Sequence, residues 1–165
     1  MIAFKDLPAF VLGPLRDRPD SDWYQSPPGK WSAAQVVDHL GAGIDKSGST
    51  FATRVDKPPM TRRPRALYER AAHLLIMRVG WFPPGRKAPS QSLPADRPER
   101  AAVERQLTEG VLRFLDLERR LLPARRHDLF VKHPVLGDLT LEEWMRFHAR
   151  HAVHHARQIR ERLAG

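Results

Sequence analysis

Two histidines four residues apart, His151 and His155, lie in a stretch with the pattern of an amphipathic helix, residues 140–163. At about 100° per residue, they fall on a face that a bundle helix usually fills with leucine. The same face carries Leu141, Trp144, His148, Gln158, Ile159 and Arg162. Histidines one turn apart can reach the same ion, and neutral imidazole binds zinc, nickel, copper and iron. The pair therefore indicates either part of a metal site or two core histidines that are hydrogen-bonded to neighbouring helices.

A metal site needs a third ligand, and the composition limits what that ligand can be. The 165-residue chain has no cysteine, which excludes disulfides, thiolate ligands and a cysteine nucleophile. Any further ligand must then be His, Asp or Glu. One candidate is His39, at the edge of an apolar stripe that contains Val37, Leu40 and Ile44. A single helix histidine in such a place is more commonly structural, so its spacing alone does not assign it.

The net charge of +9 makes binding to polyanions one hypothesis. The arginines are interleaved with glutamates, as in RPERAAVERQ, and no zinc-finger, RNP or Gly-rich phosphate motif occurs. We therefore expect a solvated basic surface and no nucleic-acid partner. No apolar run is long enough to span a bilayer, and the N-terminus MIAFKDLPAF lacks the features of a secretory signal. These features predict a cytoplasmic protein without a membrane partner.

Fifteen prolines divide the chain into helix-sized windows, because proline cannot continue a helix interior. The proline-free windows are 29–57, 65–82, 99–122 and 135–165, and they predict an all-α four-helix bundle preceded by a short N-terminal segment. No internal repeat or linker divides residues 1–165, so one domain is expected. Capping boxes are predicted at Ser32 with Gln35, at Thr140 with Glu143, and at Asp96 with Glu99.

Three further expectations concern the second helix and the segments that connect the helices. The second helix is expected to place Leu67, Ala71, Leu74 and either Val79 or Met77 in the core. The long loop after it could cover a site with Trp81 and Phe82, although plain packing explains these aromatics equally well. His127 and His133 lie on irregular backbone before the last helix, where histidines are usually solvated.

The chain resembles the DinB-like superfamily, in the branch of YfiT-type proteins, in the segments WSAAQVVDHL, GWFPPGRKAP and HPVLGDLTLEEWMRFHARHAVHHARQI. The most specific motifs are W-S-x₂-Q-x₃-H, from Trp31 to His39, and H-x₃-H-x₂-Q-I, from His151 to Ile159. The resemblance covers residues 23–163. It implies a down-up-up-down bundle, often dimeric, so we expect a homodimer. It also implies one divalent metal ion, held by His39, His151 and His155.

Three neutral imidazoles would leave a zinc, nickel or iron ion with a position open to water or substrate. Such an ion favours loss of a proton from a bound water or thiol. The resemblance therefore implies an enzyme that acts on a small molecule, either a metal-dependent hydrolase or a transferase of a low-molecular-weight thiol, as in bacillithiol- and mycothiol-dependent members. Because the chain has no cysteine, the thiol would arrive as a cosubstrate.

Supporting roles are less specific. His148 is the best inward candidate for a general base, ahead of Asp38 and Asp45, and could instead contact a ligand or substrate. Gln158 is expected to orient a ligand or a bound water through its amide. His154 is expected to pack between helices. Two alternatives to an enzyme stay open: a metal-stabilised bundle with a stress-response or interaction role, and a nucleic-acid-binding protein.

Overall fold

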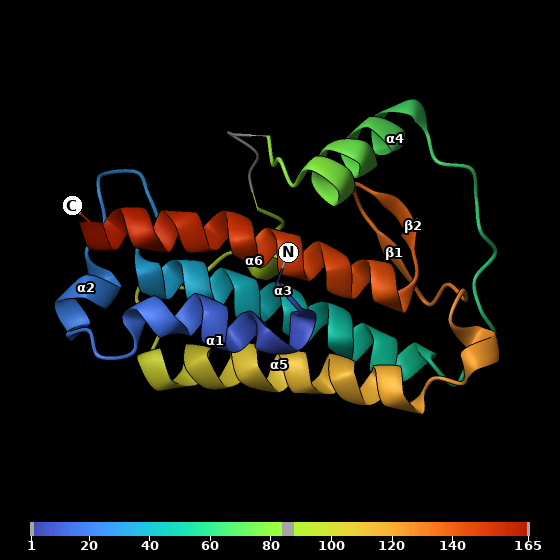
Figure 1. The fold of residues 1–165 in the computed structure, drawn as a ribbon, viewed down its shortest axis with the longest axis horizontal. Helices are drawn as coiled ribbons and strands as arrows, with labels where there is room; N and C mark the ends of the chain where they lie inside the picture. Colours follow the sequence, from blue (N-terminus) through green and yellow to red (C-terminus); the bar gives the residue numbers. More distant parts are fainter. Residues whose placement is uncertain (1, 84–87, 165) are drawn as a thin grey trace.

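The computed structural model describes residues 2–83 and 88–164. Three long helices lie side by side in Figure 1: α3 (Ala33–Arg54), α5 (Arg100–Arg120) and α6 (Leu141–Ala164). Residues 84–87, within the predicted family segment GWFPPGRKAP, lie outside the described part. The all-α prediction is confirmed, and the long helices fill three of the four predicted windows. In residues 2–83 and 88–164, no helix combines the length and apolar character needed to cross a bilayer.

The remaining elements are short. The N-terminal segment contains the 3₁₀ turn η1 (Phe4–Asp6), α1 (Leu7–Leu12), the 3₁₀ turn η2 (Gly13–Leu15) and α2 (Asp20–Tyr24). The second predicted window contains α4 (Leu67–His73), which continues as the π-helical turn η3 (Leu74–Val79). Two more 3₁₀ turns, η4 (Ser90–Ser92) and η5 (Pro123–Arg125), lie on either side of α5, and a hairpin of β1 (Val131–His133) and β2 (Gly137–Leu139) precedes α6.

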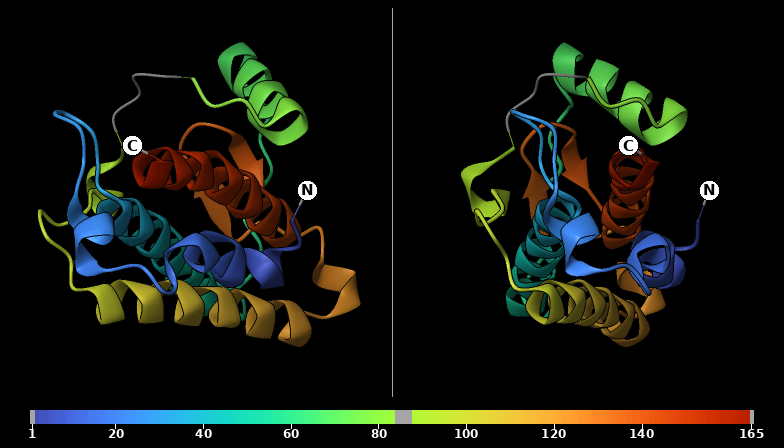
Figure 2. Two further views of the ribbon diagram at one scale, coloured as in Figure 1. Left: turned by 60° about the vertical axis from the view of Figure 1, so that its left-hand side comes forward. Right: turned by 90° about the vertical axis from the view of Figure 1, so that its left-hand side faces the viewer.

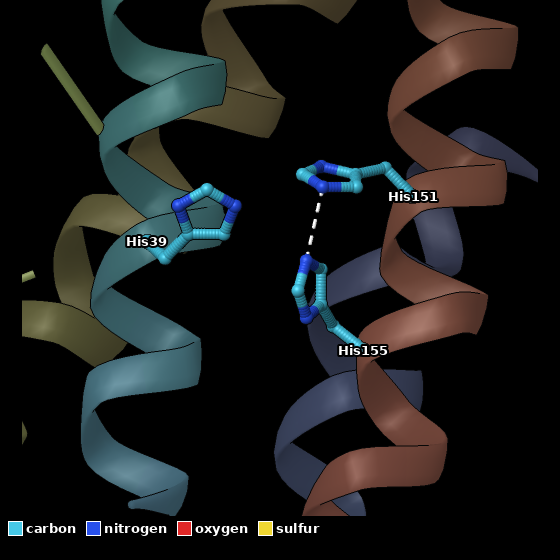
Figure 3. Close-up of side chains that lie close together, drawn as sticks. All are labelled: His39, His151 and His155. Carbon is cyan, nitrogen blue, oxygen red and sulfur yellow. Dashed lines mark hydrogen bonds between the residues drawn. The ribbon is translucent and has the colours of Figure 1, made fainter. Parts of the chain in front are cut away.

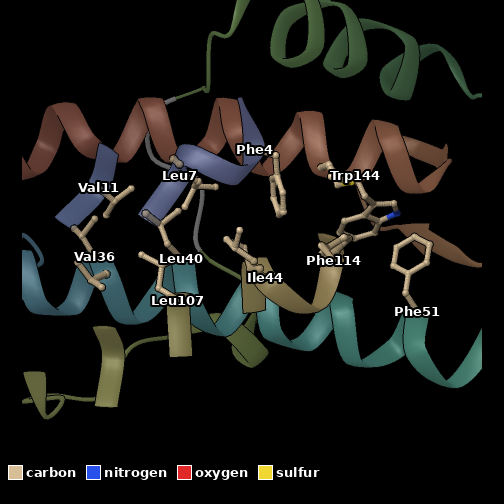
Figure 4. Close-up of a cluster of buried hydrophobic side chains, with 14 of the residues drawn as sticks. Phe4, Leu7, Val11, Val36, Leu40, Ile44, Phe51, Leu107, Phe114 and Trp144 are labelled. Atoms are coloured by element: carbon tan, nitrogen blue, oxygen red, sulfur yellow. The ribbon is translucent and has the colours of Figure 1, made fainter. Parts of the chain in front are cut away.

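The hydrophobic core lies between α3, α5, α6 and the N-terminal segment. Leu7 and Val11 of α1 are fully buried, and in Figure 4 they lie between α6 and the apolar side chains of α3. Helices α3 and α5 approach closely at Gly110, where an added Cβ would lie 3.0 Å from Cγ2 of Ile44. The N-terminal segment is therefore part of the bundle and not only a lead into it, because its apolar residues complete the core.

Two of the three predicted capping boxes are present. Ser32 and Gln35 exchange both hydrogen bonds at the start of α3, and Thr140 and Glu143 do so at the start of α6. The box predicted at Asp96 is wrong. Glu99 itself caps α5, and its carboxylate accepts hydrogen bonds from the backbone N–H groups of residues 101 and 102. Pro98 disfavours helical backbone at the preceding residue, which explains the later start.

The predicted core face of the second helix is wrong at three positions. Leu67 and Leu74 are 83% and 57% exposed and Ala71 is exposed as well, whereas Met77, one of the two alternatives for the fourth position, is buried, as is Ile76. Figure 2 shows α4 outside the bundle, beyond α6 and the hairpin. The reason is spatial, because the N-terminal segment already covers the core between α5 and α6.

An ion pair attaches the start of α4 to the hairpin. Glu69, only 1% exposed, accepts hydrogen bonds of 2.6 and 3.0 Å from the Arg63 guanidinium and one of 2.8 Å from the N–H of Ala66. These bonds, those from Arg63 above all, lower the pKa of Glu69 to about 2. The backbone N–H of Arg63 donates to Asp138 in β2. Gly137, with φ of +77°, leaves room for the Glu69 carboxylate.

The hairpin corrects the prediction for His133, which is buried and not solvated. Its Nδ1 accepts hydrogen bonds of 3.1 Å from the N–H groups of Val135 and Leu136 and so closes the turn between β1 and β2. Burial lowers the pKa of His133 to about 4, so the ring is neutral at pH 7. His127 is exposed, as predicted.

Candidate metal centre

The structure brings His39, His151 and His155 together in the bundle. Figure 3 shows the His39 ring extending from α3 toward the two rings of α6. One potential ligand atom from each residue lies within 4.8 Å of the other two. Ring centroids are 4.5 Å apart for His151 and His155, and 5.1 and 5.0 Å from His39 to each of them. The expected convergence is therefore present, while metal binding stays a prediction.

Hydrogen bonds hold two of the three rings in the tautomer that a metal ligand needs. The Nδ1–H of His39 donates to the carbonyl oxygen of Ser92 at 2.6 Å. The Nδ1–H of His155 donates to Oε1 of Gln158 at 2.8 Å. Since a neutral imidazole carries one hydrogen, Nε2 of each ring then has a free lone pair. This is the arrangement by which outer hydrogen bonds orient histidine ligands.

The spacing of the nitrogen atoms fits a small divalent ion. Nε2 of His151 and Nε2 of His155 are 3.0 Å apart. Two nitrogen ligands of a tetrahedral zinc ion lie about 3.3 Å apart, given bonds of about 2.05 Å. The two Nε2 atoms would therefore have to move only slightly apart to share an ion.

All three rings are in the neutral form at pH 7. Burial lowers the pKa of His39, and it lowers the pKa of His151 well below the usual value, with a further contribution from the neighbouring His155. Burial likewise lowers the pKa of His155 to about 3. Neutral imidazole is the form that binds metals, so protons do not compete for the cluster near neutral pH.

Aromatic side chains flank the cluster on two sides. Trp31 lies 4.9 Å from the His39 ring and stacks on His155 with centroids 6.5 Å apart. Phe82 lies 5.3 Å from His151, which supports the suggestion that this loop covers a site. Trp81, in contrast, is 49% exposed. These flanking rings exclude water from the sides of the cluster and help to keep the imidazoles neutral.

Gln158 connects the cluster to a fourth histidine. Its Oε1 accepts from His155, and its Nε2 lies 3.4 Å from Nε2 of His154. His154 is half-buried and packs against Phe82 with ring centroids 4.9 Å apart. His154 thus packs against a loop residue and not between helices, while the ligand-orienting role of Gln158 stays a prediction that has the hydrogen bond it requires.

The candidate bases have other partners. His148 is buried among Phe4, Phe114 and Trp144, and its Nε2 lies 2.9 Å from Oγ of Ser47. These are the contacts of a core histidine, and its catalytic role stays a prediction.

The carboxylates of the other two candidate bases, Asp38 and Asp45, also bind groups of the protein. Asp38 accepts a hydrogen bond of 2.9 Å from the N–H of Ala95, and Asp45 pairs with Arg113.

Sequence reasoning missed two parts of the site. The carbonyl of Ser92 belongs to a loop without periodicity, and a backbone acceptor has no residue-type signature. The second part is Trp31, to which the sequence analysis assigned no role at the cluster. Its place in the motif W-S-x₂-Q-x₃-H was the available signal, because the helix begun at Ser32 carries His39 about two turns later, on the side that Trp31 covers.

The comparisons with known proteins agree with this architecture. The family model of the DinB superfamily matches residues 4–159. Among solved structures the chain is similar to YfiT from Bacillus subtilis, at 21% identity and a TM-score of 0.65, over 97% of this chain and 81% of that chain. That protein is described as a probable metal-dependent hydrolase with an unusual four-helix bundle topology. The likeness confirms the predicted four-helix bundle. No curated protein matches.

Burial of His148 predicts a loss of stability in acid. Its pKa is lowered to about 3, mainly by burial, against 6.5 for the free side chain. Below pH 6.5 the unfolded state therefore binds a proton that the folded state does not. As the pH falls below 6.5, this residue should lower the free energy of unfolding by up to about 1.4 kcal/mol per pH unit. Above pH 6.5 both states hold a neutral ring, and no stability is lost.

His148→Phe tests this, because phenylalanine cannot take up the proton and Ser47 still donates to the carbonyl of Gly43. Urea unfolding of metal-free protein between pH 7.5 and 5 should show a shallower decline for the variant, by about 2 kcal/mol at pH 5. Exposed His127, replaced in the same way, is the control. Parallel declines in wild type and His148→Phe would contradict the assignment.

Proposed function

The chain belongs to the DinB superfamily, and on that premise we propose that it is a metal-dependent enzyme. In this proposal His39, His151 and His155 hold one divalent ion, with zinc, nickel and iron as candidates. The observation that carries the proposal is the convergence of three imidazoles, two buried and one, that of His151, half-buried, whose ligand atoms lie within 4.8 Å of one another. Two of them donate their Nδ1–H groups outward, which leaves Nε2 available.

An ion in this position would act as a Lewis acid with a position open to water or a thiol, whose pKa it lowers. The chain's own residues supply the rest. Ser92 and Gln158 hold the His39 and His155 rings, and Trp31 and Phe82 shield the flanks of the cluster. The chain has no cysteine, so a thiol nucleophile would have to come from a small molecule.

Hydrolysis of a small-molecule substrate is the first form of the proposal. Transfer of a low-molecular-weight thiol to an electrophile is the second, and one observation favours it. Asp38 and Asp45, the acidic candidates for a base, accept hydrogen bonds from Ala95 and Arg113. A thiol, with a pKa of about 8.5, loses its proton near neutral pH with far less assistance than water needs.

The metal site predicts a specific loss on mutation. Purified protein should contain about one divalent ion per chain by elemental analysis, as expected for a three-histidine site. His39→Ala and His155→Ala should each remove most of it, because two remaining ligands bind a divalent ion weakly. The control is His127→Ala, which removes an exposed histidine and should keep the ion. Wild-type protein that takes up no zinc, nickel or iron at neutral pH would refute the proposal.

The hydrogen bond from His155 to Gln158 predicts a smaller effect. Gln158→Leu leaves the Nδ1–H of His155 without an acceptor, so metal affinity should fall about 10- to 100-fold. Gln158→Glu keeps an acceptor oxygen and should retain affinity. Competition with a chelating dye measures both, and the absorption spectrum of the cobalt-substituted protein reports changes in ligand geometry. Equal affinities for the Leu and Glu variants would show that the contact does not orient the ligand.

Activity assays separate the two reaction classes. With metal-loaded protein, a hydrolase should cleave an activated ester without added thiol. A thiol transferase should instead consume a halogenated aromatic electrophile only when a thiol is present, forming the carbon–sulfur bond as halide leaves. Either activity should fall at least about 100-fold in His39→Ala. A protein that binds its ion and shows neither activity across ester and electrophile panels would support a metal-stabilised, non-catalytic bundle instead.

A further inference from the structure

The outward side of α4 and η3 carries an exposed apolar surface. Of the eight large hydrophobic side chains that are exposed in the described part of the chain, five lie within residues 67–81. They are Leu67, Tyr68, Leu74, Val79 and Trp81, with exposed fractions of 83%, 65%, 57%, 67% and 49%. We call these five residues the outer face. An exposed apolar surface of this extent is characteristic of an interaction site.

The outer face lies on the outside of the molecule. Figures 1 and 2 show α4 standing beyond the bundle, with its inner side toward α6 and the hairpin. On that inner side Glu69, Ile76 and Met77 are buried. A single helix on the outside of the molecule can lie against a partner whose surface is flat or deformable.

The charge around the outer face is strongly one-sided. Residues 57–82 contain six Lys and Arg side chains and one acidic residue, Glu69. Glu69 pairs with Arg63, and Arg65 lies 3.5 Å from Glu143, so four of the six cations have no carboxylate partner among the described residues: Lys57, Arg62, Arg70 and Arg78. Arg70 and Arg78 are exposed. They lie at i−4 and i+4 from Leu74, which places Arg70 on the same side of the helix as Leu74, with Arg78 near the other end of the segment.

This combination argues against a second copy of the chain as the partner. Two outer faces packed together would bring two strongly cationic segments side by side, and like charges across an interface are unfavourable. An anionic surface has the opposite sign. Tyr68 and Trp81 lie at the two ends of the segment, and these residue types favour the boundary between lipid headgroups and hydrocarbon. A basic amphipathic helix with such residues lies in the plane of that boundary.

We propose that the outer face of α4 and η3 binds the surface of an anionic membrane. The helix lies along the bilayer with its apolar side chains among the headgroups, and Arg70 and Arg78 contact lipid phosphates. The association is peripheral, which is compatible with the absence of a spanning helix among the described residues. It departs from the sequence-based expectation of no membrane partner, which rested on the lack of a spanning run and of a secretory signal, neither of which bears on peripheral binding.

Vesicle cosedimentation of the full chain tests the proposal. Vesicles contain equal parts of phosphatidylglycerol and phosphatidylcholine, and vesicles of pure phosphatidylcholine are the comparison. Wild type should bind the anionic vesicles more strongly, and added salt should weaken that binding. Leu74→Glu should weaken it at least about tenfold, because it puts a charge in place of a buried apolar contact. Arg70→Ala should weaken it about fivefold.

A matched control is available on the opposite side of the molecule. Leu112 of α5 is 58% exposed, almost the same as Leu74, and Leu112→Glu should leave vesicle binding unchanged. Both leucines are exposed, so folding should be retained, and circular dichroism verifies this. The proposal is overturned if wild type does not sediment with anionic vesicles, or if Leu74→Glu binds as well as wild type. A dimer in solution that Leu74→Glu dissociates, without vesicle binding, would assign the outer face to a second copy.

Discussion

The structure depends on how three imidazoles are kept neutral inside a helical bundle. A buried polar ring is unfavourable unless its hydrogen-bonding groups have partners. His39 and His155 meet this requirement by donating outward, to a loop carbonyl and to Gln158. The consequence is that their remaining lone pairs point inward, toward each other and His151. The same hydrogen bonds that make burial tolerable thus leave a set of nitrogen donors directed at one point.

Much of this arrangement could be predicted from local sequence. The histidines of α6 share a face because the helix has 3.6 residues per turn, and the capping boxes at Ser32 and Thr140 set where α3 and α6 begin. Once the first residue of each helix is fixed, the helix face on which each histidine lies is fixed as well. The meeting of His39 with the α6 pair does not follow, since it depends on which helices are neighbours. The family resemblance supplied that information, and the ring distances agree with it.

The parts that sequence reasoning missed are those governed by tertiary contacts. Apolar periodicity in residues 65–82 predicted a helix correctly, but it did not predict which side would be buried. Leu67 and Leu74 are exposed because the N-terminal helix occupies the available core surface, and α4 is instead attached to the hairpin through Arg63, which binds both Glu69 and Asp138. His133 was assigned to solvent because its segment lacks periodicity, yet it closes a three-residue-strand hairpin that is too short to show alternation.

The two sides of α3 are held by different means, and this difference explains where a site can form. Toward α5, Gly110 lets the backbones approach until Ile44 fills the space where a Cβ would lie. Toward α6 the helices are joined near the cluster by imidazole rings, whose polar edges give weak apolar contact. An interface of this second kind gains little from close packing and much from a shared ligand. An ion bound there would join α3 to α6 across an interface with less contact than the one between α3 and α5, so metal binding would also stabilise the bundle.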